Sequence, residues 1–453
     1  MRLSLIGWCA ALTTAAAGPL TAQPDRAALL ARIDSLANAP IARRQAAGLS
    51  LGVIRGHDTL VLKAYGKGDL ELDTPTPDRA VYEIGSITKQ FTASAILQLV
   101  ERGKMSLDDP LTKYLPAYPT QGHTITIRRL MDHTSGIKGY TEMPSFWAMA
   151  ARKLPRDSLV ALFAKEPFDF APGDAMVYNN SAYFLLGLVI EKVSGRPYGD
   201  YVKDSLFARA GMPDSRYCSE TTITPRKVHG YDMGPAGLQK AAPIDHTWPF
   251  AAGSLCSTAG DLLAWTRALH SGRILGPDAY REILTPGVLS DGTQLRYTKG
   301  LALSEIAGHR AISHGGGIFG YTSFLAWLPD DSLTVVALFN SAGPSGPDDL
   351  VESLVALIAG RKEPKAVPYT GDLADLAGVY QGIGRGRADS VTIAVANGAL
   401  TIRRGSTPAE PLIHLGNSVF TRQNDRYTFL RRDGKVTGVR TDLVFLDVVL
   451  TKQ

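Results

Sequence analysis

The chain has 453 residues, of which 45% are hydrophobic and 20% are charged, and its formal net charge is +5 at pH 7. A chain of this length is expected to form more than one domain, each with its own core. The composition is that of an ordinary soluble globular protein. No cluster of Lys and Arg is interleaved with aromatic residues, which argues against a nucleic-acid partner.

The N-terminus has the pattern of an export signal. Arg2 is followed by an apolar run from Leu3 to Ala17 and then by small residues, with a cleavage point expected after Ala22. We therefore expect residues 1–22 to be a signal peptide and the mature protein to be periplasmic or secreted. The alternative is an anchor that stays uncut. A membrane span needs about 20 apolar residues, and we expect no stable span after signal removal.

Removal of the signal would leave two cysteines, Cys218 and Cys256. An oxidising compartment permits a disulfide between them, but no sequence pattern places them together, and we expect two free thiols. The chain contains neither a Cys-x-x-Cys nor a His-Glu-x-x-His pattern. We predict no metal site and no cofactor.

The first strong strand signals predict a β-hairpin, with residues 48–54 and 59–65 on either side of Arg55-Gly56-His57-Asp58. The first strand contains Gly48-Leu49-Ser50-Leu51-Gly52, which matches the nucleophile elbow of α/β-hydrolases by letter. An elbow needs a sharp turn from a strand into a helix, whereas this run continues as a strand. We expect a structural role for Ser50, and an α/β-hydrolase-type esterase that uses Ser50 is the alternative.

The stretch from Ile84 to Gly103 predicts the helix around which the chain is organised. From Ile87 the apolar residues recur densely enough for a buried helix that ends at Gly103. Ser86 then lies at the N-terminus, and Lys89 lies one turn later on the same side. These are a nucleophile and a candidate base. The positive end of the helix dipole favours a neutral lysine and a developing anion.

Two later segments carry further candidate residues. A loop over residues 172–181 leads into an apolar helix, which would hold Tyr178 and Asn180 rigidly; a capping Asn and a packed Tyr are the alternative roles. Before it, His133 lies at the end of a predicted short helix, where we expect a structural hydrogen bond rather than catalysis.

The sequence between residues 300 and 340 predicts several strands. A glycine run follows His314, and such a run marks a close approach by a ligand or another backbone. One hairpin precedes the helices and several strands follow them. This order predicts a single antiparallel sheet built from both ends of the domain.

The C-terminal part alternates between strands and turns and predicts a small antiparallel barrel with no evident catalytic group. We expect an α+β fold. A catalytic domain over residues 23–362 would combine an antiparallel sheet flanked by helices with a mainly helical subdomain. A linker over 363–371 and the barrel over 372–453 would follow.

Three of these segments resemble the motifs of one family. Ser86-x-x-Lys89, Tyr178-Asn179-Asn180 and His314-Gly315-Gly316 resemble, in order and spacing, those of the serine β-lactamases and penicillin-binding proteins. The resemblance is to the class C β-lactamase and D-Ala-D-Ala carboxypeptidase branch, which includes esterases, and it covers residues 27–360. The tail resembles the lipocalin-like β domains appended to such hydrolases.

The resemblance implies an exported serine hydrolase. Ser86 would attack an amide or ester carbonyl, and water would later hydrolyse the acyl-enzyme. Lys89 and Tyr178 would titrate as a coupled pair, and either could be the base. Asn180 would hydrogen-bond Lys89 or the amide side chain of the substrate.

The resemblance also implies how the substrate is held. The backbone N–H groups of Ser86 and Gly317 would form an oxyanion hole, and Gly315 and Gly316 would let the substrate lie along the strand edge. His314 stands where class C β-lactamases usually have a lysine. Because a histidine is largely neutral near pH 7, efficient β-lactam hydrolysis is not expected.

Three substrate classes remain open at this point: β-lactams, D-amino-acid peptides and small esters. A non-catalytic peptidoglycan-binding protein with a relict site is a further alternative. The four residues Ser86, Lys89, Tyr178 and Asn180 are all present, which argues against that reading.

Overall fold

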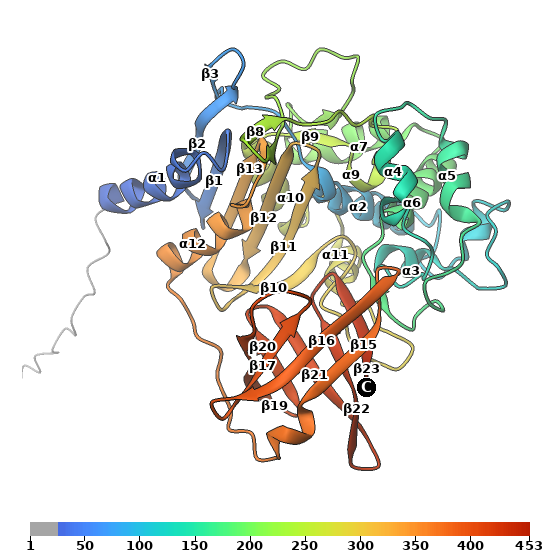
Figure 1. The fold of residues 1–453 in the computed structure, drawn as a ribbon. Coiled ribbons are helices and arrows are strands. Elements are labelled where there is room, and N and C mark those ends of the chain that lie inside the picture. The colour runs from blue at the N-terminus through green and yellow to red at the C-terminus, as the bar shows by residue number, and fades with distance from the viewer. Residues whose placement is uncertain (1–25) are drawn as a thin grey trace, which may run out of the picture.

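The computed structural model describes residues 26–453, so the predicted signal peptide lies outside the described residues. The fold is α+β, as expected. A seven-stranded antiparallel sheet is flanked by helices, a mainly helical region lies beside it, and a small β-barrel follows, shown in orange and red in Figure 1.

The main sheet is built from both ends of the catalytic part. Strand β1, from the N-terminal hairpin, pairs antiparallel with β13, the last strand of the C-terminal group, and Leu51 lies opposite Ala337. The strand order is β10-β11-β12-β13-β1-β2-β3. These strands are β1 (Gly48–Arg55), β2 (Asp58–Asp69), β3 (Thr74–Pro75), β10 (Ala302–Ile306), β11 (His309–Ile318), β12 (Tyr321–Leu328) and β13 (Leu333–Phe339).

Helices cover both faces of this sheet, as Figure 1 shows. Alternate residues of β1, including Leu49 and Leu51, pack against α1 (Arg26–Ala42) and α12 (Pro347–Ala359) in one core. On the opposite face, α10 (Ala259–His270) lies so close to β1 that a Cβ at Gly52 would contact Leu263. This alternation is the period of a strand buried on both faces.

The helical region contains α2 and α6, the two helices that carry the candidate site residues. In α2 (Thr88–Glu101) every residue from Thr88 to Leu99 is buried. The N-cap of α6 (Asn180–Ser194) is Asn179, whose side chain accepts from the Ala182 N–H, and Gly195 ends the helix with φ 70°. The other helices are α3 (Ile127–Met131), α4 (Pro144–Met149), α5 (Arg156–Ala164), α7 (Tyr198–Val202), α8 (Ala208–Ala210), α9 (Phe250–Gly253) and α11 (Pro277–Leu284).

Two small sheets join distant segments. One has the order β4-β9-β6 and the other β14-β7-β8. Their strands are β4 (Tyr82–Glu83), β6 (Arg216–Tyr217), β7 (Tyr231–Gly234), β8 (Gly237–Lys240), β9 (Leu255–Ser257) and β14 (Ser341–Ala342).

The barrel is a nearly closed antiparallel sheet whose two end strands follow one another in the chain. Its order is β18-β17-β16-β15-β23-β22-β21-β20-β19, and β5 (Met176–Val177) from the helical region pairs with β23. Met176 and Val177, which directly precede Tyr178, are thus part of the barrel sheet. The strands are β15 (Gly378–Gly384), β16 (Arg387–Ala396), β17 (Ala399–Arg404), β18 (Glu410–Pro411), β19 (Ile413–Gly416), β20 (Val419–Arg422), β21 (Asp425–Arg432), β22 (Lys435–Asp442) and β23 (Leu446–Lys452).

Cys218 and Cys256 form a disulfide, so the expectation of two free thiols is wrong. The reason is the pairing of β6 with β9, which sets Arg216 opposite Cys256 and brings the two Cα atoms to 5.3 Å. Strands this short leave no periodic signal in a sequence. Over residues 26–453, none of the helices has the length and apolar character needed to cross a membrane.

We predict that the double substitution Cys218→Ala/Cys256→Ala lowers the free energy of unfolding by about 2–4 kcal/mol, because the bridge restricts the unfolded chain across 38 residues. Urea unfolding of the variant and the oxidised parent measures this difference. Alkylation of both thiols in native protein without reductant would contradict the assignment.

Candidate active site

Ser86 lies in a single 3-10 turn, Gly85–Ile87, that leads directly into α2. Gly85 has φ +51°, and a Cβ there would lie 2.8 Å from the backbone nitrogen of Gly317. Only glycine permits this approach. The turn therefore holds Ser86 against the glycine-rich end of β11.

The amine of Lys89 has three hydrogen-bond partners. Its Nζ lies 3.1 Å from Ser86 Oγ, 2.8 Å from Asn180 Oδ1 and 2.8 Å from the carbonyl oxygen of Ala252. Asn180 is itself fixed, because its Nδ2 donates to the Thr141 hydroxyl at 3.2 Å. The structure thus brings Ser86, Lys89 and Asn180 together.

The burial of Lys89 makes its neutral form accessible. The side chain has no exposed surface, and burial lowers its pKa well below the usual value. A neutral amine has two N–H groups and one lone pair. Because Asn180 Oδ1 and the Ala252 carbonyl can only accept, they take both N–H groups. The lone pair is then left for the Ser86 hydroxyl, which is the arrangement of a base and its nucleophile.

Tyr178 packs against Lys89, whose Nζ atom lies 4.7 Å from the centre of the Tyr178 ring. Burial raises the pKa of the Tyr178 hydroxyl, and the nearby Ser86 hydroxyl lowers it by a smaller amount. The hydroxyl makes no hydrogen bond of normal geometry within residues 26–453. A phenol of this kind is a proton donor at neutral pH rather than a ready base.

His133 makes the structural hydrogen bond expected of it. Its Nδ1 accepts from the backbone N–H of Asn179 at 3.1 Å, and burial lowers its pKa far below the usual value. Its ring packs against those of Tyr178, Tyr183 and Tyr297, with centroids 4.5 to 5.0 Å apart. His133 thus positions the loop that carries Tyr178 and Asn180.

His314 is buried and neutral. Its Nδ1 donates to the carbonyl of Gly315 at 2.6 Å, which leaves Nε2 to accept from the Tyr297 hydroxyl at 3.0 Å. Burial, with a smaller contribution from Lys89, lowers the pKa of His314 to about 3. A ring held in this way offers no positive charge to a substrate.

The glycines after His314 lie on a free strand edge. β11 pairs with β10 only as far as Ser313, opposite Ala302, whereas its pairing with β12 continues to Ile318. A Cβ at Gly316 would collide with the carbonyl oxygen of Ile84, while one at Gly317 would meet nothing within 4 Å. The backbone at Gly317 is therefore open toward the cleft beside Ser86.

A cleft of about 670 Å³ opens next to Ser86. Its wall is largely apolar, and Trp147, which is 65% exposed, stacks on Phe319 with ring centroids 5.5 Å apart. Asp232 is the one charged residue among those that line it. The lining also includes Ser86, Tyr140, Phe146, Asn180, Ile244, Gly317 and Ile318.

The barrel contributes Phe445, which sequence reasoning missed. The backbone N–H of Tyr178 donates to the Phe445 carbonyl at 3.2 Å. The Phe445 ring packs at 5.4 Å from the rings of both Tyr178 and His314. No signal in the sequence links this loop residue to the site, because the contact depends on how the barrel docks.

Ser50 lies in the middle of β1, between β2 and β13, with its hydroxyl 3.0 Å from that of Tyr82. No turn into a helix follows it. The alternative of an α/β-hydrolase that uses Ser50 is therefore wrong, because the letters of the motif fall in a continuous strand.

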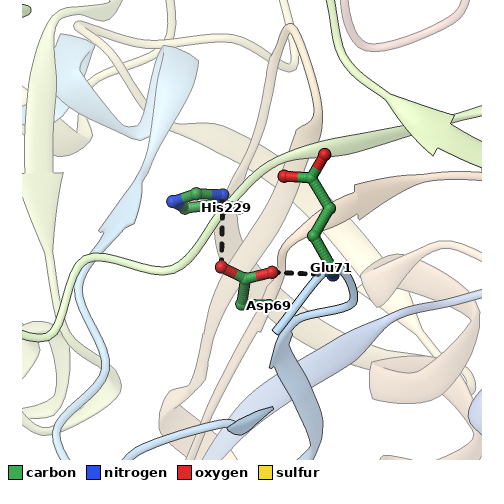
Figure 2. Close-up of side chains that lie close together, drawn as sticks. All are labelled: Asp69, Glu71 and His229. Carbon is green, nitrogen blue, oxygen red and sulfur yellow. Dashed lines mark hydrogen bonds and ion pairs between the residues drawn. The ribbon is translucent and has the colours of Figure 1, made fainter. Parts of the chain in front are cut away.

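Asp69, Glu71 and His229 lie close together, as Figure 2 shows. The Asp69 carboxylate already accepts from the backbone N–H groups of Glu71 and Leu72, and its other oxygen is 3.6 Å from His229 Nδ1. Glu71 pairs with Lys240 at 3.1 Å. These contacts show that Asp69, Glu71 and His229 stabilise the exposed turn that follows β2.

Residues 33–360 match the family described as Beta-lactamase. Penicillin-binding protein 4* of Bacillus subtilis (strain 168) is 28% identical over 303 residues, which are 63% of this chain and 66% of that protein. A solved D-stereospecific amidohydrolase from Streptomyces sp. is 28% identical with a TM-score of 0.63, over 75% of this chain and 100% of its own.

The fold of the whole chain also has a solved counterpart. A structure described as the octameric penicillin-binding protein homologue from Pyrococcus abyssi is 24% identical, with a TM-score of 0.64 over 93% of this chain and 99% of its own. This likeness concerns the fold alone. The chain spans between 58% and 66% of the length of three curated relatives that it matches.

We predict that Gly316→Ala slows the reaction of Ser86 with a fluorophosphonate by about 100-fold, because the new methyl group must displace the Ile84 carbonyl and with it the Ser86 turn. The labelling rate, followed by intact mass, measures this. Gly260→Ala on α10, where a Cβ meets nothing nearer than 3.6 Å, is the control. Equal rates in the two variants would contradict the prediction.

Proposed function

Because this chain belongs to the β-lactamase family, we propose that it is a serine hydrolase that cleaves an amide or ester through an acyl-enzyme on Ser86. The observation that carries the proposal is the 3.1 Å contact between Ser86 Oγ and the buried amine of Lys89. Ser86 lies at the edge of a cleft large enough for a substrate of drug size.

In the first step, neutral Lys89 accepts the proton of the Ser86 hydroxyl while Oγ attacks the carbonyl carbon. The oxygen of the tetrahedral intermediate is stabilised by the backbone N–H groups of Ser86 and Gly317, and one such donor contributes about 10²–10³ in rate. The two acceptors Asn180 and Ala252 stabilise the ammonium that forms on Lys89.

Collapse of the intermediate breaks the bond to the leaving group. Tyr178 donates its proton to the leaving nitrogen or oxygen and is reprotonated from Lys89, which lies beside its ring. This division of roles follows from the two environments, since burial favours neutral Lys89 and protonated Tyr178. Water then attacks the acyl carbonyl carbon and gives a proton to neutral Lys89. The second tetrahedral intermediate breaks the bond to Ser86 Oγ, which takes that proton from Lys89 as the carboxylic acid leaves.

We propose that the cleft binds an apolar acyl group. Phe146, Trp147 and Phe319 present aromatic surface beside Ser86, and Lys and Arg are absent from the residues that line it. An amide or ester of an apolar D-amino acid fits this wall, and the likeness to a D-stereospecific amidohydrolase supports that class. Neutral His314 removes the cation that a β-lactam carboxylate would need.

We also propose that the protein is exported, with a signal peptide over residues 1–22, a catalytic domain to residue 362 and a barrel domain from 372. The disulfide between Cys218 and Cys256 supports this, because disulfides persist in oxidising compartments. The stretch between α12 and β15 supports the boundary, since it contains no strand and only one short 3-10 helix, Leu373–Leu376.

The test is covalent labelling followed by turnover. A fluorophosphonate is expected to add one adduct at Ser86 in the parent and in Ser50→Ala, and none in Ser86→Ala. Peptide mapping locates the adduct. A panel of nitrocefin, a short-chain nitrophenyl ester and an apolar D-amino-acid amide then separates the substrate classes, with the amide or ester expected to react fastest. Absence of any adduct would favour a non-catalytic binding protein with a relict site.

We predict that kcat/KM rises with pH as Lys89 loses its proton and reaches a plateau below the ordinary lysine pKa. The sign follows from the lowered pKa, since the neutral amine is the active form and protonation at low pH removes it. Lys89→Arg, whose guanidinium stays charged, is expected to lose about 10²–10⁴-fold in kcat. An active Lys89→Arg variant would exclude Lys89 from this role.

A further inference from the structure

The cleft that contains Ser86 also contains a carboxylate, on Asp232. Asp232 belongs to β7, which pairs with β14 and sets Ala342 opposite it, and both residues line the cleft. Of the described residues that line this cleft, Asp232 alone carries a charge. The mechanism proposed above gives that charge no role.

One oxygen of the Asp232 carboxylate is held by the protein and the other is available. Oδ1 accepts from the backbone N–H of Gly320 at 3.1 Å, in the turn between β11 and β12. Oδ2 has neither a hydrogen bond nor an ion pair with any residue from 26 to 453, and the side chain is half-buried. The contact with Gly320 therefore fixes the carboxylate and leaves one oxygen to bind a ligand.

The lysines in the segments around β7 are already paired with other carboxylates. Lys240, on the adjacent strand β8, has its Nζ 3.1 Å from Glu71. Lys227, which shortly precedes β7, has its Nζ 2.7 Å from Glu83. A partly desolvated carboxylate is stabilised by a positive partner. Since these lysines are committed elsewhere, the cation for Asp232 has to come with a ligand.

The position of Asp232 sets the length of the group that it can bind. Its partner Gly320 lies three residues after Gly317, whose N–H group belongs to the proposed oxyanion hole. A chain advances about 3.3 Å per residue, so the carboxylate lies on the order of 10 Å from the scissile carbonyl. An α-amino group is two bonds from the carbonyl carbon and is too near. A lysine ammonium is six bonds from it, and with a hydrogen bond of about 2.8 Å it spans this distance.

We propose that Asp232 binds the ammonium group at the end of a long acyl side chain, so that the preferred substrate is an amide or ester of a lysine-like D-amino acid. This rests on the proposed function, in which the acyl group occupies the cleft, and it adds a charged end to that apolar group. The methylene stem would pack on the aromatic wall that includes Trp147 and Phe319. Oδ2 would accept a charge-assisted hydrogen bond from the ammonium.

The test compares two esters that differ in one group. They are the methyl esters of Nα-acetyl-D-lysine and Nα-acetyl-D-norleucine, whose side chain has the same stem with hydrogen in place of the ammonium. Asp232→Asn is expected to raise KM for the lysine ester by about tenfold, the effect of a charge-assisted hydrogen bond at a half-buried site, and to leave the norleucine ester within twofold. The asparagine Oδ1 can still accept from Gly320, so the turn is retained.

Glu71→Gln is the matched control, because it removes the same charge from an exposed carboxylate that does not line the cleft. It is expected to resemble the parent on both esters. Added salt is expected to raise KM for the lysine ester alone, since it screens the attraction between the ammonium and Asp232.

Three outcomes would overturn the proposal. The first is an unchanged KM for the lysine ester in Asp232→Asn. The second is an equal loss on both esters, which would mean that Asp232 only supports the turn at Gly320. The third uses the methyl ester of D-norleucine with a free α-amino group. A loss on this ester in Asp232→Asn as large as that on the lysine ester would place the cation at the α position.

A binding measurement separates this inference from the proposed function. In a Ser86→Ala background, calorimetry is expected to show tighter binding of Nα-acetyl-D-lysine amide than of the norleucine amide, and Asp232→Asn should remove the difference. If the parent forms no adduct with a fluorophosphonate but this preference is present, the hydrolase proposal fails and the ammonium site stands. If the adduct forms and the preference is absent, the ammonium site fails alone.

Discussion

The amine of Lys89 has no exposed surface, and no carboxylate is among its hydrogen-bond partners. An isolated charge in that position would be costly, so the environment favours loss of the proton. The chemistry of the site then depends on two neutral acceptors that occupy both N–H groups. One is the carbonyl of Ala252 in α9, and the other is Asn180 at the start of α6. The positions of α6 and α9 relative to α2 therefore decide whether the lone pair faces Ser86.

A second constraint is the closeness of two backbones. The turn at Gly85 and the strand at Gly316 approach so closely that a side chain on either glycine would meet the other segment. Ser323 Oγ strengthens the contact by donating to the Ile84 carbonyl at 2.9 Å. β10 ends before this point, which leaves Gly317 beside the cleft. The same glycines thus position the nucleophile and keep the strand edge free.

The sequence predicts the parts of this arrangement that have long, regular signals. α2 and α6 are long, apolar and ended by glycine, and the strands around residues 300–340 have clear boundaries, so Ser86, Lys89, Tyr178 and Asn180 can be placed on elements. The disulfide could not be predicted, because β6 and β9 have two and three residues. Phe445 could not be predicted either, because its contacts with Tyr178 and His314 arise from docking between segments more than 100 residues apart, where local pattern carries no information.

The barrel and the identity of residue 314 are physically connected. A lysine at position 314 would place an ammonium among the rings of Tyr178, Tyr297 and Phe445, where burial disfavours charge. Histidine fits this enclosure because its neutral form satisfies both nitrogens with Tyr297 and Gly315. Phe445 comes from the barrel and closes this enclosure on one side, so the docking of the barrel favours a neutral group at residue 314.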